Sequence, residues 1–225
     1  MQRKQPPEQI RQKKKRKSRV SPAAAVIIGV LLFALGFYLG YTRGVGAKRR
    51  DMNILLVNES HPLPAGYEPE GLVNLYQMRH SFRLARSDIY LTNKCYQAAQ
   101  EMFAAAEAAD MNGYIITSGY RSYEKQQEVY AESEPGYAQA PGCSEHQTGL
   151  CFDVTVQSND FESTPQYSWL AANAHKYGFI QRYPAGKSGI TGISYEPWHY
   201  RYVGIDAAAE IYKKNLTLEE YLGKV

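Results

Sequence analysis

The 225-residue chain carries a formal net charge of +4, but this average combines regions of opposite sign. Residues 1–22 hold nine Lys or Arg against the single acid Glu8, whereas residues 51–225 sum to −8, which argues against a nucleic-acid-binding body. Three cysteines are too few for a disulfide scaffold in a chain of this length.

The N-terminal region predicts a membrane anchor. Residues 23–41 contain no formal charge, and as a helix they would span roughly 28 Å, close to the ~30 Å hydrocarbon core of a bilayer. We therefore expect a basic cytoplasmic tail (1–22), a transmembrane helix (23–41) and a linker (42–50). Nine basic residues before the helix outnumber four after it, which places residues 51–225 on the outer side of the cell membrane. The alternative is a cleaved signal peptide, whose apolar core is normally shorter.

The first half of the body mixes a helix, a strand and a second helix. Residues 92–110 are dense in helix formers and follow a capping residue, Thr92, so we expect an amphipathic helix. Its apolar face would comprise Tyr96, Ala99, Met102, Phe103 and Ala106. Residues 114–118 predict a short strand, and the segment from Ser122 predicts a capped helix.

The second half continues the mixture. Thr164, Pro165 and Gly178 predict the start and end of a helix. The aromatic segment SYEPWHYRYV predicts a strand, and TLEEYL contains a capping box with Glu220. Because regular strand-helix alternation is missing, we predict one α+β domain rather than a doubly wound fold.

Two phrases, SEHQTGLCFDV (144–154) and EPWHYRYVG (196–204), concentrate possible metal ligands. Catalytic zinc typically takes three protein ligands and leaves a fourth position for water, and His146, Asp153 and His199 supply three. Gly149 would permit the corner between His146 and the strand that carries Asp153. The alternative is a pair of satisfied core histidines. Two histidines that each have a carboxylate at short spacing favour the metal.

Glu196 is the candidate general base. On a regular strand, positions 196 and 199 would face opposite ways, so a bend at Pro197 is needed to bring the carboxylate over the metal. Zinc lowers the pKa of bound water to about 7, and a carboxylate within reach can then accept its proton. The pattern predicts a hydrolase that works at neutral pH.

Arg121 in SGYRS (118–122) is the candidate anion-binding group. It follows a predicted strand at the mouth of a helix, where a guanidinium could hold a substrate carboxylate or a developing oxyanion. A surface salt bridge is an equally good interpretation of the motif alone. Gln126 could face the same cleft, and Tyr120 and Trp198 could wall it.

The cysteines around His146 leave three possibilities open. Cys143 and Cys151 bracket the histidine. They could form a disulfide that holds the loop, remain free thiols, or supply a thiolate ligand to the metal.

Five ordered phrases resemble the VanY-type D-alanyl-D-alanine carboxypeptidases, zinc peptidases of bacterial cell walls. They cover 53–225 and read LLVNESHPLP, SGYRSYEKQ, PGCSEHQTGLCFDV, HKYGFIQRYP and GITGISYEPWHYRYVG. The resemblance implies a small α+β fold of the hedgehog-like type, with an antiparallel sheet flanked by helices. Cys151 departs from the pattern, since many relatives have a small apolar residue there.

The resemblance also implies the roles of individual residues. It implies His146, Asp153 and His199 as ligands of one Zn²⁺ per chain and Glu196 as the catalytic base. Arg121 would handle the substrate carbonyl or carboxylate, with Gln126 and Ser144 as further substrate contacts.

The implied substrate is the stem peptide of peptidoglycan, which ends in D-Ala-D-Ala. We therefore expect a monomeric, membrane-anchored zinc carboxypeptidase, not a serine-type enzyme, that removes the terminal D-alanine and binds no nucleic acid. Rival activities are L,D-carboxypeptidase and cross-link endopeptidase on the same polymer. A different class of function is a non-catalytic wall-binding module, in which a fourth ligand such as Cys143 closes a structural zinc site.

Overall fold

The computed structural model describes residues 54–134 and 137–225, so the tail, helix and linker predicted for 1–50 lie outside the described residues. Within the described ranges, no helix is both long enough and apolar enough to cross a membrane.

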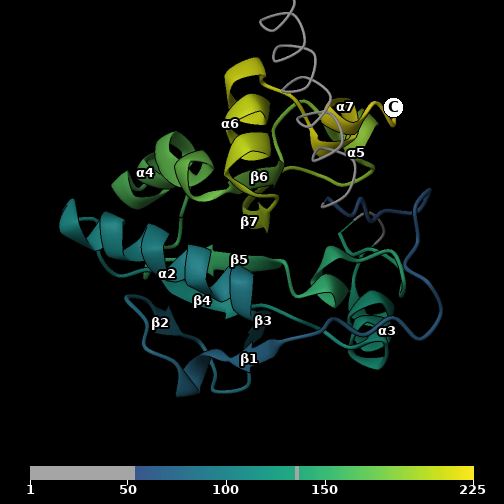
Figure 1. Ribbon diagram of the computed structural model, residues 1–225, viewed down its shortest axis with the longest axis horizontal. Helices are drawn as coiled ribbons and strands as arrows, with labels where there is room; N and C mark the ends of the chain where they lie inside the picture. The colour runs from purple at the N-terminus through teal and green to yellow at the C-terminus, as the bar shows by residue number, and fades with distance from the viewer. Residues whose placement is uncertain (1–53, 135–136) are drawn as a thin grey trace, which may run out of the picture. The chain divides into compact units, whose positions relative to one another are not determined.

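The described chain alternates short strands and helices (Figure 1). The strands are β1 (Leu72–Asn74), β2 (Arg83–Leu84), β3 (Tyr90–Thr92), β4 (Ile115–Ser118), β5 (Cys151–Thr155), β6 (Phe179–Tyr183) and β7 (Glu196–Tyr202). The α-helices are α2 (Asn93–Ala108), α3 (Tyr123–Glu132), α4 (Pro165–Asn173), α5 (Ser188–Thr191), α6 (Ile205–Lys214) and α7 (Leu218–Leu222). Three 3-10 helices complete the set: η1 (Leu75–Gln77), η2 (Glu145–Thr148) and η3 (Ala174–Tyr177).

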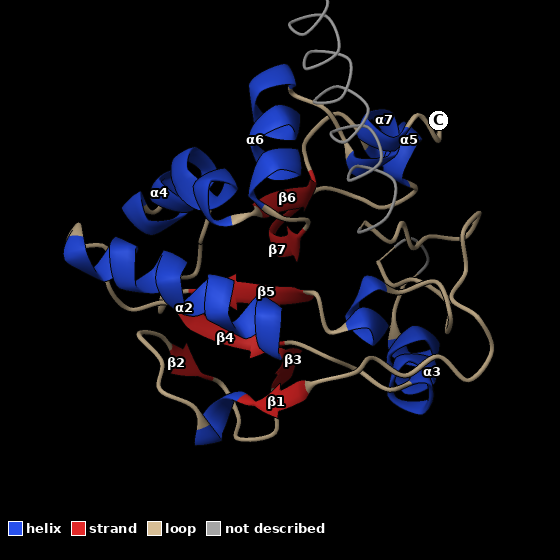
Figure 2. Ribbon diagram, in the orientation of Figure 1, coloured by secondary structure: helices blue, strands red, loops and turns tan. Residues whose placement is uncertain are grey.

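A five-stranded sheet in the order β2-β4-β5-β7-β6 organises these elements (Figure 2). β4, β5, β7 and β6 pair antiparallel, as expected, whereas β2 pairs parallel to β4. The prediction of a wholly antiparallel sheet is therefore wrong at this edge. The chain passes from β2 to β4 through β3 and α2, and a crossover that contains a helix brings two strands into the same direction. β1 and β3 form a separate antiparallel pair.

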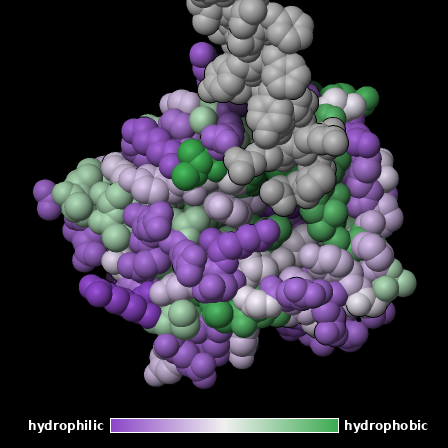
Figure 3. Space-filling view, viewed as in Figure 1, coloured by the Kyte–Doolittle hydropathy of each residue, from purple (hydrophilic) through white to green (hydrophobic). Residues whose placement is uncertain are grey.

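Helix α2 packs its predicted apolar face onto this sheet. The five face residues are all buried, and the Phe103 ring lies 5.7 Å from that of Phe152 on β5. The opposite face carries exposed polar side chains such as Lys94 and Glu101. In Figure 3, hydrophilic residues (purple) lie over the part of α2 nearest the middle of the view, and a pale green group lies at its left end. Thr92 is the N-cap residue, but its hydroxyl donates to the Gly149 carbonyl at 3.2 Å instead of capping the helix. This bond joins the start of α2 to the end of η2.

The other predicted helix boundaries are confirmed. The side chains of Ser122, Thr164 and Thr217 each accept a hydrogen bond from a backbone N–H in the first turn of α3, α4 and α7. Glu220 completes the capping box of α7. The segment formed by α4 and η3 ends at Gly178, whose φ of 85° suits a residue without a Cβ.

Candidate metal centre

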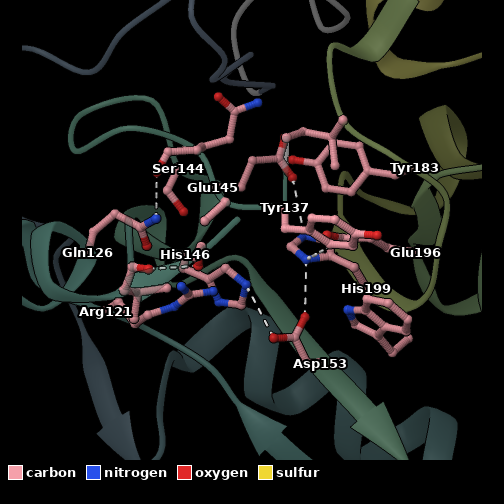
Figure 4. Close-up of a pocket in the computed structure, with 16 residues that line it drawn as sticks. Arg121, Gln126, Tyr137, Ser144, Glu145, His146, Asp153, Tyr183, Glu196 and His199 are labelled. Atoms are coloured by element: carbon pink, nitrogen blue, oxygen red, sulfur yellow. Dashed lines mark hydrogen bonds and ion pairs between the residues drawn. The ribbon is translucent and has the colours of Figure 1, made fainter. Parts of the chain in front are cut away.

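The three predicted metal ligands converge from η2 and from two adjacent strands. Asp153 of β5 and His199 of β7 are register partners. Asp153 Oδ1 lies 3.1 Å from His199 Nδ1, and Oδ2 lies 3.5 Å from His146 Nε2. Figure 4 shows the Asp153 carboxylate between the two imidazoles. The structure therefore brings together side chains that are 53 positions apart, from His146 to His199.

The orientation of His146 is fixed by the local chain path. Its Nδ1 lies 2.7 Å from the Gly119 carbonyl, which can only accept, so Nδ1 carries the proton. Nε2 is thereby left as a lone-pair donor on the side of Asp153. Gly149 ends η2 in the left-handed conformation, with φ of 63°, and turns the chain into β5.

The buried polar atoms of this cluster fit a divalent cation. His146 and His199 are 4% and 3% exposed. Among the described residues, Asp153 Oδ1 has no hydrogen-bond partner, although it is close to His199 Nδ1. Burial lowers the pKa of His146, but Cys151 and Asp153 outweigh burial and raise it to about 9, so a cation bound at Nε2 would displace a proton from that atom. Two imidazole nitrogens that each lie within 3.5 Å of one carboxylate form a donor set that zinc accepts.

Cys151 lies next to these ligands, and the sequence left its role open. One ligand atom each from His146, Cys151 and His199 lies within 4.8 Å of the others. This set competes with the one that contains Asp153. Asp153 lines the cavity beside the cluster, whereas Cys151 is 0% exposed and does not. We therefore assign Asp153 to the side that substrate can reach and Cys151 to the rear of the cluster.

Of the three possibilities for Cys143 and Cys151, the structure matches free thiols. Cys143 and Cys151 are both free thiols, so the disulfide hypothesis is wrong for this structure. Cys143 also lies outside the ligand cluster found among the described residues, so it does not supply the fourth ligand of a closed site. Cys151 and Asp153 are two positions apart on β5, so their side chains lie on the same face of the strand. This spacing is the sequence signal that could have predicted Cys151 beside the metal ligands.

A cavity of about 180 Å³ opens beside the cluster. Its lining includes the predicted substrate contacts Arg121, Gln126 and Ser144, together with Trp198. Tyr120 is not part of the lining, so the prediction that it walls the pocket is wrong. Among the lining residues that were not predicted are Tyr137, Glu145 and Tyr183.

Glu196 faces the same cavity because β7 is irregular at its start. Gln181 pairs with Tyr200 and Tyr183 pairs with Glu196, so four steps along β7 match two along β6. This bulge includes Pro197 and turns Glu196 to the side of His199, as the bend hypothesis requires. Glu196 Oε2 lies 3.6 Å from His199 Nδ1. Burial raises the pKa of Glu196, and His199 opposes that effect.

Arg121 and Gln126 present unused hydrogen-bonding groups in the cavity wall. The backbone N–H of Arg121 donates to the His146 carbonyl at 3.2 Å, which fixes the position of the residue beside the cluster. Gln126 Nε2 donates to the Gln139 carbonyl at 2.7 Å. Within the part of the chain that the structure describes, Arg121 Nε and Gln126 Oε1 are buried and lack partners. Both atoms are free to bind a ligand.

Several known proteins are similar to this chain in sequence and in fold. The family described as VanY, D-alanyl-D-alanine carboxypeptidase, matches residues 88–205. A D-alanyl-D-alanine carboxypeptidase of Enterococcus faecium is 39% identical over 76% of this chain, and one of Enterococcus faecalis strain V583 is 41% identical over 77%. These matches span 57% and 66% of the length of those two relatives. The putative carboxypeptidase YodJ of Bacillus subtilis is 44% identical over 77% of this chain and 68% of its own length.

Two solved structures represent the neighbours in fold. The LdcB LD-carboxypeptidase superposes with a TM-score of 0.66 at 39% identity, over 76% of this chain and 85% of that one. The D,D-pentapeptidase VanY of a VanB-type vancomycin resistance cassette, a variant solved with Zn(II), superposes with a TM-score of 0.61 at 39% identity, over 74% and 97%. Together with the match over residues 88–205, these likenesses show that the chain belongs to the VanY family of D-alanyl-D-alanine carboxypeptidases.

Proposed function

We propose that this chain is a zinc-dependent D,D-carboxypeptidase that removes the terminal D-alanine from peptidoglycan stem peptides. The observation that carries the proposal is the convergence of His146, Asp153 and His199 beside a cavity that Glu196 and Arg121 also line. A VanY with bound Zn(II) and a VanYB with bound D-alanine-D-alanine, each 39% identical to this chain, support it.

The ligand residues would hold the zinc through His146 Nε2, His199 Nδ1 and the Asp153 carboxylate. When bound, the zinc supplies Lewis acidity and lowers the pKa of water into the neutral range. The hydrogen bond from His146 Nδ1 to Gly119 holds that imidazole in the tautomer whose Nε2 can bind a metal.

Glu196 and Arg121 would carry the remaining chemistry. Glu196 is close enough to the ligand cluster to take a proton from the attacking water and pass it to the departing amine of D-alanine. Arg121 carries a permanent positive charge and would hold the terminal carboxylate or the developing oxyanion. Gln126 and Ser144 would contact the substrate on the η2 and α3 side of the cavity.

The enzyme would act outside the cell membrane, with residues 23–41 as its anchor. This part of the proposal rests on the uncharged apolar run and on the excess of basic residues before it. The chain would be a monomer, because one set of ligands, base and arginine is already contained in the described residues.

A second candidate is L,D-carboxypeptidase activity on a tetrapeptide stem. The similarity to the LdcB LD-carboxypeptidase favours it, since that structure has the same 39% identity as VanY and a TM-score of 0.66. The two activities differ in the configuration of the residue before the scissile bond, which the cavity must recognise.

The test is to incubate the full chain with pentapeptide and tetrapeptide stems, with and without a chelator, and to weigh the products. We expect the pentapeptide alone to lose one D-alanine, and the chelator to stop the loss. Cleavage of the tetrapeptide alone would establish the L,D activity instead. No cleavage of either stem by zinc-loaded protein would refute both enzymatic candidates.

A further inference from the structure

Glu145 is a buried carboxylate beside the ligand cluster that no predicted role explains. It immediately precedes His146 and is 1% exposed. Its Oε1 is held by Arg182 Nε at 2.8 Å and by Arg201 Nη1 at 2.7 Å. Its Oε2 has no hydrogen-bond partner among the described residues and lies 3.7 Å from His199 Nε2. One oxygen is therefore fixed, and the other faces an imidazole.

The same imidazole has an unused nitrogen on that side. His199 Nδ1 faces Asp153 and Glu196, whereas Nε2 faces Glu145 and makes no hydrogen bond within the described chain. Figure 4 shows Asp153 and Glu145 on opposite sides of the His199 ring. A neutral imidazole that binds a metal through one nitrogen carries its proton on the other, and that proton needs an acceptor when it is buried.

We propose that Glu145 is a positioning residue that accepts the Nε2–H of His199 and so holds this imidazole in the tautomer and orientation that bind the metal. The inference rests on the proposed zinc site and adds a residue to it. At 3.7 Å the two atoms are slightly too far apart for a hydrogen bond, so the contact must shorten by several tenths of an ångström on metal binding. A carboxylate in this place raises the basicity of the ligand and fixes its ring.

The surroundings of Glu145 suit this task. Arg182 and Arg201 are both 0% exposed. Both guanidinium groups carry a permanent positive charge and contact one oxygen of Glu145, at 2.8 and 2.7 Å. Arg182 also binds Glu219 of α7 through two nitrogens, at 2.9 and 2.6 Å. The carboxylate is thus ionised and anchored on one oxygen, which leaves the other aimed at His199.

A purely structural ion-pair network would contain the same arginines, so the test must separate the two roles. Glu145→Gln and Glu219→Gln each remove one negative charge next to Arg182, but only Glu145 faces His199. Glu219→Gln is therefore the matched control. Zinc affinity of the full chain is measured by competition with a chromogenic chelator, beside the unfolding temperature of each variant.

We expect Glu145→Gln to weaken zinc binding roughly 10–100-fold, and Glu219→Gln to change it by less than about threefold, while both lower the unfolding temperature. A folded Glu145→Gln variant that binds zinc as tightly as the wild type would overturn the inference. So would equal losses of zinc affinity in both variants. A wild-type chain that takes up no zinc would overturn the proposed function as well, which distinguishes the two failures.

A second measurement keeps the inference testable if Glu145→Gln does not fold. In the zinc-loaded wild type, ¹⁵N spectra of the histidine rings should show a slowly exchanging proton on Nε2 of His199. His146 serves as the internal control, because its bond to Gly119 requires the proton on Nδ1. A His199 ring protonated on Nδ1, or an Nε2 proton that exchanges as fast as that of an exposed histidine, would overturn the inference.

Discussion

Replacement of Glu196 by Gln removes the proposed base with little change in shape. The side chain is 12% exposed and its Oε2 lies 3.6 Å from His199 Nδ1, so the variant keeps the volume and polarity of the site but cannot accept a proton. General base catalysis typically contributes 10²–10⁴-fold. We therefore expect kcat to fall by about 10²–10⁴, which corresponds to about 2.7–5.4 kcal/mol of transition-state stabilisation. Zinc content should stay at one per chain, because Glu196 is not a proposed ligand.

The assay follows release of D-alanine from a saturating pentapeptide stem, with zinc measured by mass spectrometry on the same samples. Glu162→Gln is a suitable control, because Glu162 accepts a bond from the Tyr195 hydroxyl at 2.7 Å and does not line the cavity. It should retain wild-type turnover. Turnover of Glu196→Gln within threefold of the wild type would refute the base role, and loss of its zinc would make Glu196 a ligand.

Three further predictions concern residues next to the proposed metal ligands. Gly149→Ala should lower the free energy of unfolding, measured in urea, by about 1–2 kcal/mol. The reason is that φ of Gly149 is 63° and the new Cβ would come within 2.9 Å of Leu72 Cδ2. An unchanged urea midpoint of unfolding would contradict this prediction. Cys151→Ala should keep one zinc per chain, and the cobalt-substituted wild type should show no thiolate charge-transfer band. A band that this substitution abolishes would make Cys151 a ligand. Although burial opposes the effect, Arg182 and Arg201 lower the pKa of Glu145 from 4.5, so its stabilisation is present above pH 4.5 and is lost as the pH falls. In chelator, the difference in unfolding free energy between the wild type and Glu145→Gln should narrow by about 1.4 kcal/mol per pH unit below that pH; a difference that does not change with pH would contradict the assignment.

Local sequence signals predicted the elements that have caps and periodic faces. Ser122, Thr164 and Thr217 accept the expected capping bonds, and the apolar face of α2 is buried as predicted. The parallel edge strand β2 was not predicted. It contains only Arg83 and Leu84, too few residues for an alternating pattern, and its direction depends on a crossover through α2.

The residues of the site also fall into two groups: those that short sequence motifs predicted, and those that only the fold brings into the site. His146, Asp153 and His199 stand in short phrases whose order along the chain suggested a shared cation, and the structure places them within contact of one another. No local sequence signal predicted that Glu145 is buried, because an isolated Glu is normally exposed. Its burial depends on Arg182 and Arg201, which β6 and β7 bring from distant positions.

The most direct test of the zinc site is anomalous diffraction at the zinc edge from crystals of the zinc-loaded chain. We expect one anomalous peak, about 2.0–2.2 Å from His146 Nε2, His199 Nδ1 and an Asp153 oxygen. Glu196 should lie beside it without coordinating. A peak bound by the Cys151 thiolate in place of Asp153, or no peak between the two imidazoles, would contradict the proposed zinc site.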